Sequence, residues 1–254
     1  MVVSYAFGDG SDAARRLAVV HRVFVPLADR VLCDVVHRSP GVVADLGCGP
    51  GHTTRFLVER WPAAEVIGVE ASASFLALAT SRLPGVRFVH GDVTDPGALP
   101  AGRADLVYAR FLLSHLPDVA GAISTWRAWL APEGRLVLEE PERIDTDDPV
   151  FRAYLAATAD AVAARGATML AGPLVDRATA GLDGVVLSRV VAHPVATSQA
   201  ATMFSLNLAT IRNDPAAGLD SATASMLESE LSVRRDDHRC EAITWQVRQL
   251  AIAR

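Results

Sequence analysis

Three glycines at alternate positions follow a short apolar segment in the first quarter of the chain. Residues 42–46 read VVADL and lead into GCGPG, which contains Gly47, Gly49 and Gly51. Glycine has no Cβ, so the backbone can turn sharply and approach a ligand where any side chain would collide. Cys48 lies inside this loop and is small enough to be buried there. The pattern predicts a loop that binds a ligand against bare peptide groups.

Two polar residues beside the loop indicate what it binds. A nicotinamide dinucleotide fingerprint, GxGxxG, needs a third glycine where this chain has His52. Asp45 precedes the loop, and its carboxylate would repel a pyrophosphate but attract an ammonium or sulfonium group. The loop therefore favours S-adenosylmethionine over NAD as the cofactor.

Two further carboxylates follow at the ends of the next two apolar segments. Glu70 lies 23 positions after Gly47, where a carboxylate can accept both hydroxyls of a ribose, a spacing that NAD would also fit. Asp92, in HGDVTD, can read an adenine amine together with the backbone N–H of Val93. We therefore expect Glu70 and Asp92, with their neighbours Ala71 and Val93, to bind the adenosyl part of the cofactor.

The elements that position these residues are predicted to be alternating strands and helices. Apolar segments of strand length recur between stretches with helical spacing, at residues 42–46, 66–70, 87–92, 104–110 and 134–140. Short apolar strands joined by single helices specify a parallel sheet covered on both faces. The predicted fold is a doubly wound α/β fold, in which ligands bind beyond the carboxyl ends of the strands.

Helices are predicted on both sides of this core. Residues 13–36 carry apolar side chains at helical spacing, although Pro26 should break or kink that helix. After the fifth strand, Asp148 is a suitable N-cap for a helix that Gly166 would end.

The last third of the chain contains two more predicted strands, at residues 184–193 and 243–253. Helical patterns fill the sequence between them. We expect a single domain in which residues 1–40 form a helical lid, residues 41–140 the cofactor-binding core, and residues 194–242 a helical cap inserted between strands six and seven.

Composition narrows the class of protein. The 254 residues carry a formal net charge of -5, which argues against a nucleic-acid binder, and no apolar run approaches the roughly 18 residues of a membrane span. The 24 cationic residues are all arginine, which excludes a Schiff-base or P-loop lysine. The three cysteines are too widely spaced for a disulfide or zinc framework. We expect a cytoplasmic protein that could form a homodimer.

Together these motifs resemble the class I S-adenosylmethionine-dependent methyltransferases. The resemblance rests on VADLGCGPG, VIGVE, FVHGDVTD, ADLVYARFLLSHLPD and LAPEGRLVLEE, and is dense from about residue 40 to 140. It implies a Rossmann-like sheet of seven strands in the order 3-2-1-4-5-7-6, with strand 7 antiparallel. It also implies that Gly47, Gly49, Glu70 and Asp92 hold the cofactor.

The two ends of the chain resemble the small-molecule branch of that family more weakly. There the N-terminal helix closes over the cofactor, which would place Tyr5 and Arg16 near the methionine moiety. Arg110 and His115, which follow the fourth strand, should border the transferred methyl group. Because an arginine stands where a metal-dependent enzyme would place acidic ligands, we expect no metal.

His115 and Glu140 are the candidate catalytic residues. His115 fits either a general base or a structural residue that caps a loop. Glu140 is a second candidate to orient or deprotonate a substrate, although its cluster with Glu139 and Glu142 is typical of a solvated strand end.

The expected reaction is transfer of a methyl group from S-adenosylmethionine to an oxygen, nitrogen or carbon atom of a small organic molecule, as in natural-product biosynthesis, with S-adenosylhomocysteine released. The alternative is a scaffold that binds the same cofactor for a non-methylating cyclisation or elimination, since a fold does not fix a reaction. His52 and Asp45 disfavour a third class, the NAD-dependent oxidoreductases. The identity of the acceptor stays open.

Overall fold

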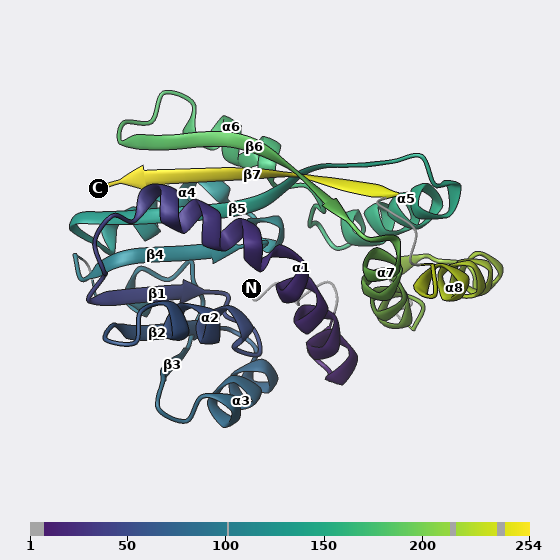
Figure 1. Ribbon diagram of the computed structural model, residues 1–254, viewed down its shortest axis with the longest axis horizontal. Coiled ribbons are helices and arrows are strands. Elements are labelled where there is room, and N and C mark those ends of the chain that lie inside the picture. Colours follow the sequence, from purple (N-terminus) through teal and green to yellow (C-terminus); the bar gives the residue numbers. More distant parts are fainter. Residues whose placement is uncertain (1–7, 101, 214–216, 238–241) are drawn as a thin grey trace.

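The computed structural model describes residues 8–100, 102–213, 217–237 and 242–254. Within these ranges seven strands form one sheet in the order β3-β2-β1-β4-β5-β7-β6 (Figure 1). The strands are β1 (Val42–Leu46), β2 (Glu65–Glu70), β3 (Arg87–His90), β4 (Ala104–Arg110), β5 (Leu130–Thr146), β6 (Val185–Val195) and β7 (Ile243–Ala253). The predicted sheet order is confirmed.

The direction of the strands also agrees with the prediction. β1 to β5 pair in parallel, and β7 lies antiparallel between β5 and β6. β5 is longer than the predicted segment 134–140 because β7 pairs with it as far as Thr146, which faces Ile243. Charged side chains interrupt the apolar pattern of this extension, so the sequence alone does not reveal it.

The helices cover both faces of the sheet. They are α1 (Ser11–Val35), α2 (His52–Arg60), α3 (Ala73–Arg82), α4 (Val119–Ala128), α5 (Pro149–Ala163), α6 (Gly172–Thr179), α7 (Thr197–Ile211) and α8 (Ser221–Arg235). α1 and α2 pack on one face of the sheet, and α4 and α6 pack on the other.

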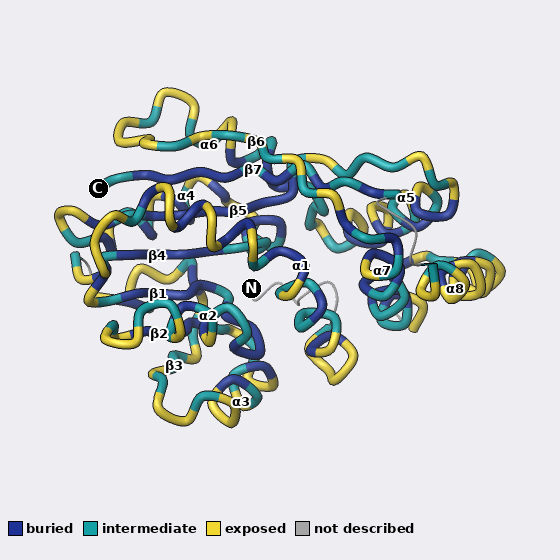
Figure 2. The backbone as a smooth tube through the Cα atoms, in the orientation of Figure 1, coloured by how far each residue is buried: buried dark blue, intermediate teal, exposed yellow. Residues whose placement is uncertain are grey.

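Side chains at alternating positions of each central strand pack into the two apolar cores on opposite faces of the sheet. In β4, Leu106 and Tyr108 pack with α1 and α2, whereas Val107 and Ala109 pack with α4. Successive side chains of a strand point to opposite faces, so a sheet covered on both sides needs strands that are apolar throughout. Figure 2 shows the result: the central strands are buried along most of their length, and exposed residues lie on the outer sides of helices and in loops.

α1 passes through Pro26 as one continuous helix, so the expected break does not occur. The helix is held because Phe24 and Leu27 are buried in one apolar cluster, while residues from Ala28 onward are buried in another. Two side chains of the sheet also bond to carbonyl groups of α1. His193 Nε2 lies 2.8 Å from the carbonyl oxygen of Val23, and Gln249 Nε2 donates to that of Leu27 at 3.3 Å. These contacts anchor α1 to the sheet on either side of Pro26.

β5, β6 and β7 reach beyond the parallel strands and carry a second group of helices (Figure 1). Ile144 of β5 faces Trp245 of β7 in this overhang. An apolar cluster there unites α5, α7 and α8 with the first half of α1. We call α7 and α8, which connect β6 to β7, the cap helices. α1 therefore joins the cap helices to the sheet.

Replacing Pro26 with alanine should stabilise the protein. Pro26 is exposed, so the change removes no core packing. The alanine also supplies a backbone N–H, which can donate to the carbonyl group one turn earlier in the helix. Alanine is about 3 kcal/mol better than proline inside a helix, and a more flexible unfolded chain offsets about 1 kcal/mol of this. We expect a gain of about 1–3 kcal/mol in the free energy of unfolding, measured by urea denaturation.

Pro149→Ala is the matched control. Pro149 is also exposed, but it occupies the first position of α5, where its missing N–H needs no partner. This variant should be neutral or slightly less stable than the parent chain. A loss of stability in Pro26→Ala would show that the proline is required by the packing of α1.

Candidate functional site

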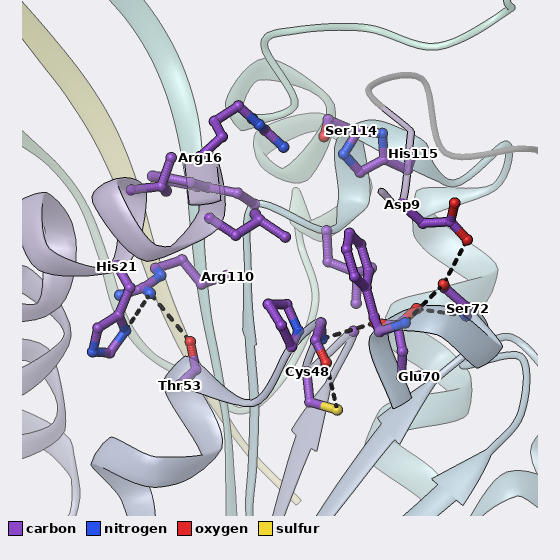
Figure 3. A pocket seen from close by; sticks show the side chains of 18 of the residues that line it. Asp9, Arg16, His21, Cys48, Thr53, Glu70, Ser72, Arg110, Ser114 and His115 are labelled. Atoms are coloured by element: carbon purple, nitrogen blue, oxygen red, sulfur yellow. Dashed lines mark hydrogen bonds between the residues drawn. The ribbon is translucent and has the colours of Figure 1, made fainter. Parts of the chain in front are cut away.

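A cavity of about 730 Å³ lies beyond the carboxyl ends of β1, β2 and β4. Its wall is formed by the first half of α1, the loops after those strands, and residues of β5, α5, α7 and β7. Figure 3 shows Arg16, Ser114 and His115 on one side of the pocket, and Cys48, Glu70 and Ser72 on the other. The sequence-predicted residues on its wall are Arg16, Gly47, Cys48, Gly49, Glu70, Ala71, Asp92, Val93, Arg110 and His115. Tyr5 lies outside the described residues.

The glycine loop turns through left-handed backbone conformations. Gly47 and Gly49 have φ values of 60° and 54°, which side chains rarely adopt, and both line the cavity. Gly51 also has a positive φ but does not line the cavity. A Cβ on Gly51 would lie 3.2 Å from the Cα of Ala79, so this glycine allows α2 to begin close against α3.

Glu70 ties the glycine loop to the start of α3. Its carboxylate accepts hydrogen bonds from the backbone N–H groups of Gly49 and Ser72, each at 2.8 Å. Its side chain also lines the cavity, as do Ala71 and the Asp92–Val93 pair. Asp92 Oδ1 accepts from both the backbone N–H and the hydroxyl of Thr94, at 2.8 and 2.7 Å. Both carboxylates are thus held in place by short-range hydrogen bonds at the cavity wall.

Asp45 lies behind the loop and does not line the cavity. Its Oδ2 accepts a hydrogen bond from Thr54 Oγ1 at 2.6 Å, and its side chain is only 2% exposed. Burial raises the pKa of Asp45 to about 7. The structure therefore places this carboxylate under the start of α2 rather than against a ligand.

Arg110 projects from the end of β4 into the cavity wall. Its Nη2 donates to Thr53 Oγ1 at 3.1 Å and lies 3.2 Å from His21 Nδ1. Burial and the nearby Arg110 cation lower the pKa of His21 to about 4, so His21 is neutral at pH 7 and can accept that bond. His21 was missed in the sequence because a lone histidine on a helix carries no recognisable spacing.

His115 lies after β4 in a short 3-10 turn, Leu113–His115. It lines the cavity near Arg16 and Ser114 (Figure 3). Burial, with a smaller contribution from the Arg16 cation, lowers the pKa of His115 to about 4. The imidazole is neutral at pH 7 and is a weak proton acceptor compared with an ordinary histidine.

Glu139 and Glu140 are each 1% exposed, so the expectation of a solvated acidic cluster is wrong for both. Glu139 accepts hydrogen bonds from the Tyr108 hydroxyl and from Gln249 Nε2. Glu140 Oε1 accepts from the backbone N–H groups of Leu112 and Leu113, both at 2.7 Å. Neither carboxylate lines the cavity. Gln249 of β7 and the loop after β4 supply partners for these carboxylates, and a local sequence pattern cannot indicate such contacts.

The far half of the cavity is largely aromatic. Phe24, Phe111, Tyr154, Phe204 and Trp245 line it, and they come from five different segments of the chain. Helical periodicity places such residues in a core but does not show that they face an open cavity, so the sequence did not reveal them.

Two general features of the described residues bear on the site. No group of three or more histidine, cysteine, aspartate or glutamate side chains within them is placed to hold a metal ion. The helices in these ranges include none that is long and apolar enough to cross a membrane.

Comparison with known sequences connects this geometry to a family. A methyltransferase domain family matches residues 43–134. A trans-aconitate 2-methyltransferase from Methylobacterium nodulans is 37% identical over 158 residues, which are 58% of this chain and 60% of that protein. The match thus spans less than two thirds of the length of this relative.

Solved structures share the fold at low sequence identity. A geranyl diphosphate C-methyltransferase from Streptomyces coelicolor, in complex with S-adenosyl-L-homocysteine, is 16% identical, with a TM-score of 0.55 over 98% of this chain and 86% of that one. The [4+2]-cyclase SpnF is also 16% identical, with a TM-score of 0.56 over 89% and 80% of the two chains. The chain thus shares the fold of these solved structures, and its residues 43–134 are similar to a methyltransferase domain family.

Proposed function

We propose that the protein binds S-adenosylmethionine and transfers its methyl group to a small organic molecule. The observation that carries the proposal is a single cavity with two unlike halves. One half presents the glycine loop and two carboxylates at strand ends, and the other half is aromatic. Arg110 and His115 line the same cavity. All-arginine cation usage, typical of a high-GC genome, supports a natural-product acceptor.

The residues of the first half suit an adenosyl cofactor. The glycine loop offers backbone without side chains, and Glu70 and Asp92 present carboxylate oxygens that can accept from ribose hydroxyls and an adenine amine. The geranyl diphosphate C-methyltransferase, which shares this fold, is in complex with S-adenosyl-L-homocysteine, and this supports the choice of cofactor. S-adenosylmethionine would supply a methyl group already activated by its sulfonium.

The protein's contribution is mainly positioning. With a pKa near 4, His115 is poorly suited to remove a proton at neutral pH. It can accept a hydrogen bond from an acceptor hydroxyl or amine and so orient the nucleophile. Orientation of two bound reactants can lower a barrier by roughly 7–11 kcal/mol. Burial of the aromatic half would keep water from the reacting atoms.

Glu140 positions the loop that carries His115. Its two hydrogen bonds fix the N–H groups of Leu112 and Leu113, directly after Phe111, whose φ of 55° is the one positive value among described residues other than glycine. Such backbone conformations persist only where neighbouring structure holds them. Glu140 therefore acts through the loop rather than on the acceptor.

The alternative is a non-methylating reaction assisted by the bound cofactor. The observation that supports this alternative is the fold shared with the [4+2]-cyclase SpnF. Release of S-adenosylhomocysteine in step with acceptor consumption separates the two, because only methyl transfer produces it.

Replacing Glu70 with glutamine should weaken cofactor binding about 10- to 100-fold. Hydrogen bonds to a charged group contribute about 1.5–3 kcal/mol, and the amide cannot accept at both oxygens. Titration calorimetry with S-adenosylhomocysteine measures the change. Glu65→Gln, at the exposed opposite end of β2, is the matched control and should leave the Kd unchanged. Equal affinities in the two variants would contradict the assignment of Glu70.

The stability of the protein should fall as pH rises, in part through Glu140. Burial raises the pKa of Glu140 to about 8, above its ordinary value near 4.5. Between these values the folded state keeps a proton that the unfolded state has lost, so stability declines as pH rises across this window. The glutamine of the Glu140→Gln variant cannot ionise. Between pH 5.5 and 8.5 its free energy of unfolding should therefore fall by at least about 1 kcal/mol less than that of the parent chain, which corresponds to roughly 2–4 °C in Tm.

Thermal unfolding at the two pH values measures this difference. The control is Glu133→Gln, because the Glu133 side chain is 82% exposed and pairs only with an exposed arginine among the described residues. It should keep the pH dependence of the parent chain. A Glu140→Gln variant with the same pH dependence as the parent would show that Glu140 is already ionised in the folded state at neutral pH.

A further inference from the structure

Arg110 is a cationic side chain of the cavity wall that uses only part of its hydrogen-bonding capacity. Its Nη2 donates to Thr53 Oγ1 at 3.1 Å and lies 3.2 Å from His21 Nδ1. Its Nη1 is buried and makes no hydrogen bond within the described residues. Most buried polar atoms in folded proteins have a partner. An unpaired guanidinium nitrogen at a cavity wall therefore indicates a ligand that supplies one.

The two neighbours that bond to Arg110 do not balance its charge. Thr53 offers a neutral hydroxyl. Burial, and then the Arg110 cation itself, lower the pKa of His21 to about 4, so His21 is uncharged at pH 7. The guanidinium stays ionised at this pH. A half-buried charge without a partner of opposite sign is costly, and an anionic group in the cavity would relieve that cost.

Two buried carboxyl groups lie near Arg110 without pairing with it. The Arg110 cation lowers the pKa values of Asp45 and Glu139, but burial outweighs this effect and the net shift of each pKa is upward. Asp45 accepts a hydrogen bond from Thr54, and Glu139 accepts one from Gln249. Neither carboxyl therefore satisfies the guanidinium.

Further arginines surround this part of the cavity, where α1 meets the start of α2. His52, the first residue of α2, stacks on His21 with ring centres 5.8 Å apart. Burial lowers the pKa of His52 to about 4, and four cations add to this effect, in the order Arg82, Arg55, Arg22 and Arg110. Within the described residues none of these four arginines forms an ion pair. Their combined potential attracts an anion.

We call the four residues of this region that line the cavity the arginine corner: Arg110, His21, His52 and Thr53. The glycine loop separates the arginine corner from Glu70. In Figure 3, Cys48 of the loop lies between Glu70 on one side and Thr53 and Arg110 on the other. If Glu70 holds the ribose of S-adenosylmethionine, the methionine part of that cofactor can reach across the loop to the arginine corner.

We propose that Arg110 anchors a carboxylate group at the arginine corner. Two ligands of the proposed function can supply it: the methionine part of the cofactor, beside the glycine loop, or an acceptor that is itself an acid, since Phe111, the next residue along the chain, lines the aromatic half. The inference rests on the proposed function, because both are ligands of that reaction. It assigns Arg110 to carboxylate binding rather than to the border of the transferred methyl group, where the sequence placed it.

The first part of the experiment tests the carboxylate of the cofactor. S-adenosylhomocysteine and S-adenosyl-3-thiopropylamine differ only in that the second lacks the carboxylate. Titration calorimetry would measure both ligands with the parent chain and with Arg110→Met. If the cofactor supplies the carboxylate, the variant should bind S-adenosylhomocysteine at least 10-fold more weakly and the decarboxylated ligand less than 3-fold more weakly, because only the first loses a charge-assisted hydrogen bond.

The second part tests the carboxylate of an acceptor. 4-Hydroxycinnamate and trans-aconitate would be titrated into both chains saturated with S-adenosylhomocysteine. If an acceptor supplies the carboxylate, Arg110→Met should weaken binding of at least one of these acids 10-fold or more and leave the affinity for S-adenosylhomocysteine unchanged. The proposal is wrong if none of the three carboxylates loses 10-fold in affinity, or if the two adenosyl ligands lose affinity equally.

Two further variants separate a specific anchor from the general charge of this region. Arg55→Gln removes a cation of the same group that is exposed and does not line the cavity, and should change each Kd less than 3-fold. Arg110→Lys keeps a cation at the anchor and should lose less affinity for the carboxylate ligand than Arg110→Met. Equal losses in Arg55→Gln and Arg110→Met would overturn the role of Arg110 as the anchor.

Failure of the proposed function gives a different result. If neither adenosyl ligand binds the parent chain, the cofactor assignment fails, and titration of the two acids into the ligand-free chains then decides on Arg110 alone. If the adenosyl ligands bind and Arg110→Met weakens no carboxylate 10-fold, the proposed function stands and the role inferred for Arg110 is wrong.

Discussion

Acidic side chains hold the loops around the cavity by accepting hydrogen bonds from backbone N–H groups. Glu70, at the end of β2, bonds to Gly49 and Ser72 and so joins two loops that would otherwise order independently. Glu140 does the same for the loop after β4. Fixing a loop residue costs about 1–2 kcal/mol in backbone entropy, so loops already held this way leave more of the interaction energy for binding. The glycine loop, the start of α3 and the loop that carries His115 are all held by these bonds.

α1 belongs to the core and to the cavity at once. Its second half is buried on the sheet, and its first half contributes Arg16, His21 and Phe24 to the cavity wall. Pro26 lies between the two halves, and the helix continues through it. The same helix therefore contributes to the core and to the wall of the cavity.

Local pattern was enough to predict the strands and much of the cofactor half, and the family resemblance supplied the order of the strands. The glycine loop, Glu70, Asp92, Arg110 and His115 follow strands whose carboxyl ends meet at one edge, so parallel pairing alone brings them together. Asp45 and Gly51 do not line the cavity, because Asp45 bonds to Thr54 of α2 and Gly51 packs against Ala79 of α3. Gln249 of β7 bonds to Glu139, 110 residues away in sequence, and Phe204 of α7 stacks on Tyr154 of α5. No short-range periodicity encodes such contacts.

The cap helices form one uninterrupted connection between two antiparallel neighbours in the sheet. Met203, Phe204 and Asn207 of the cavity wall all lie in this connection, whereas the glycine loop, Glu70 and Asp92 lie before residue 95. The strands that anchor the connection are held by their own ladder of hydrogen bonds. A change confined to this connection would alter its own share of the cavity wall and leave the glycine loop intact, while Phe24, Phe111, Tyr154 and Trp245 would keep the rest of the wall as it is.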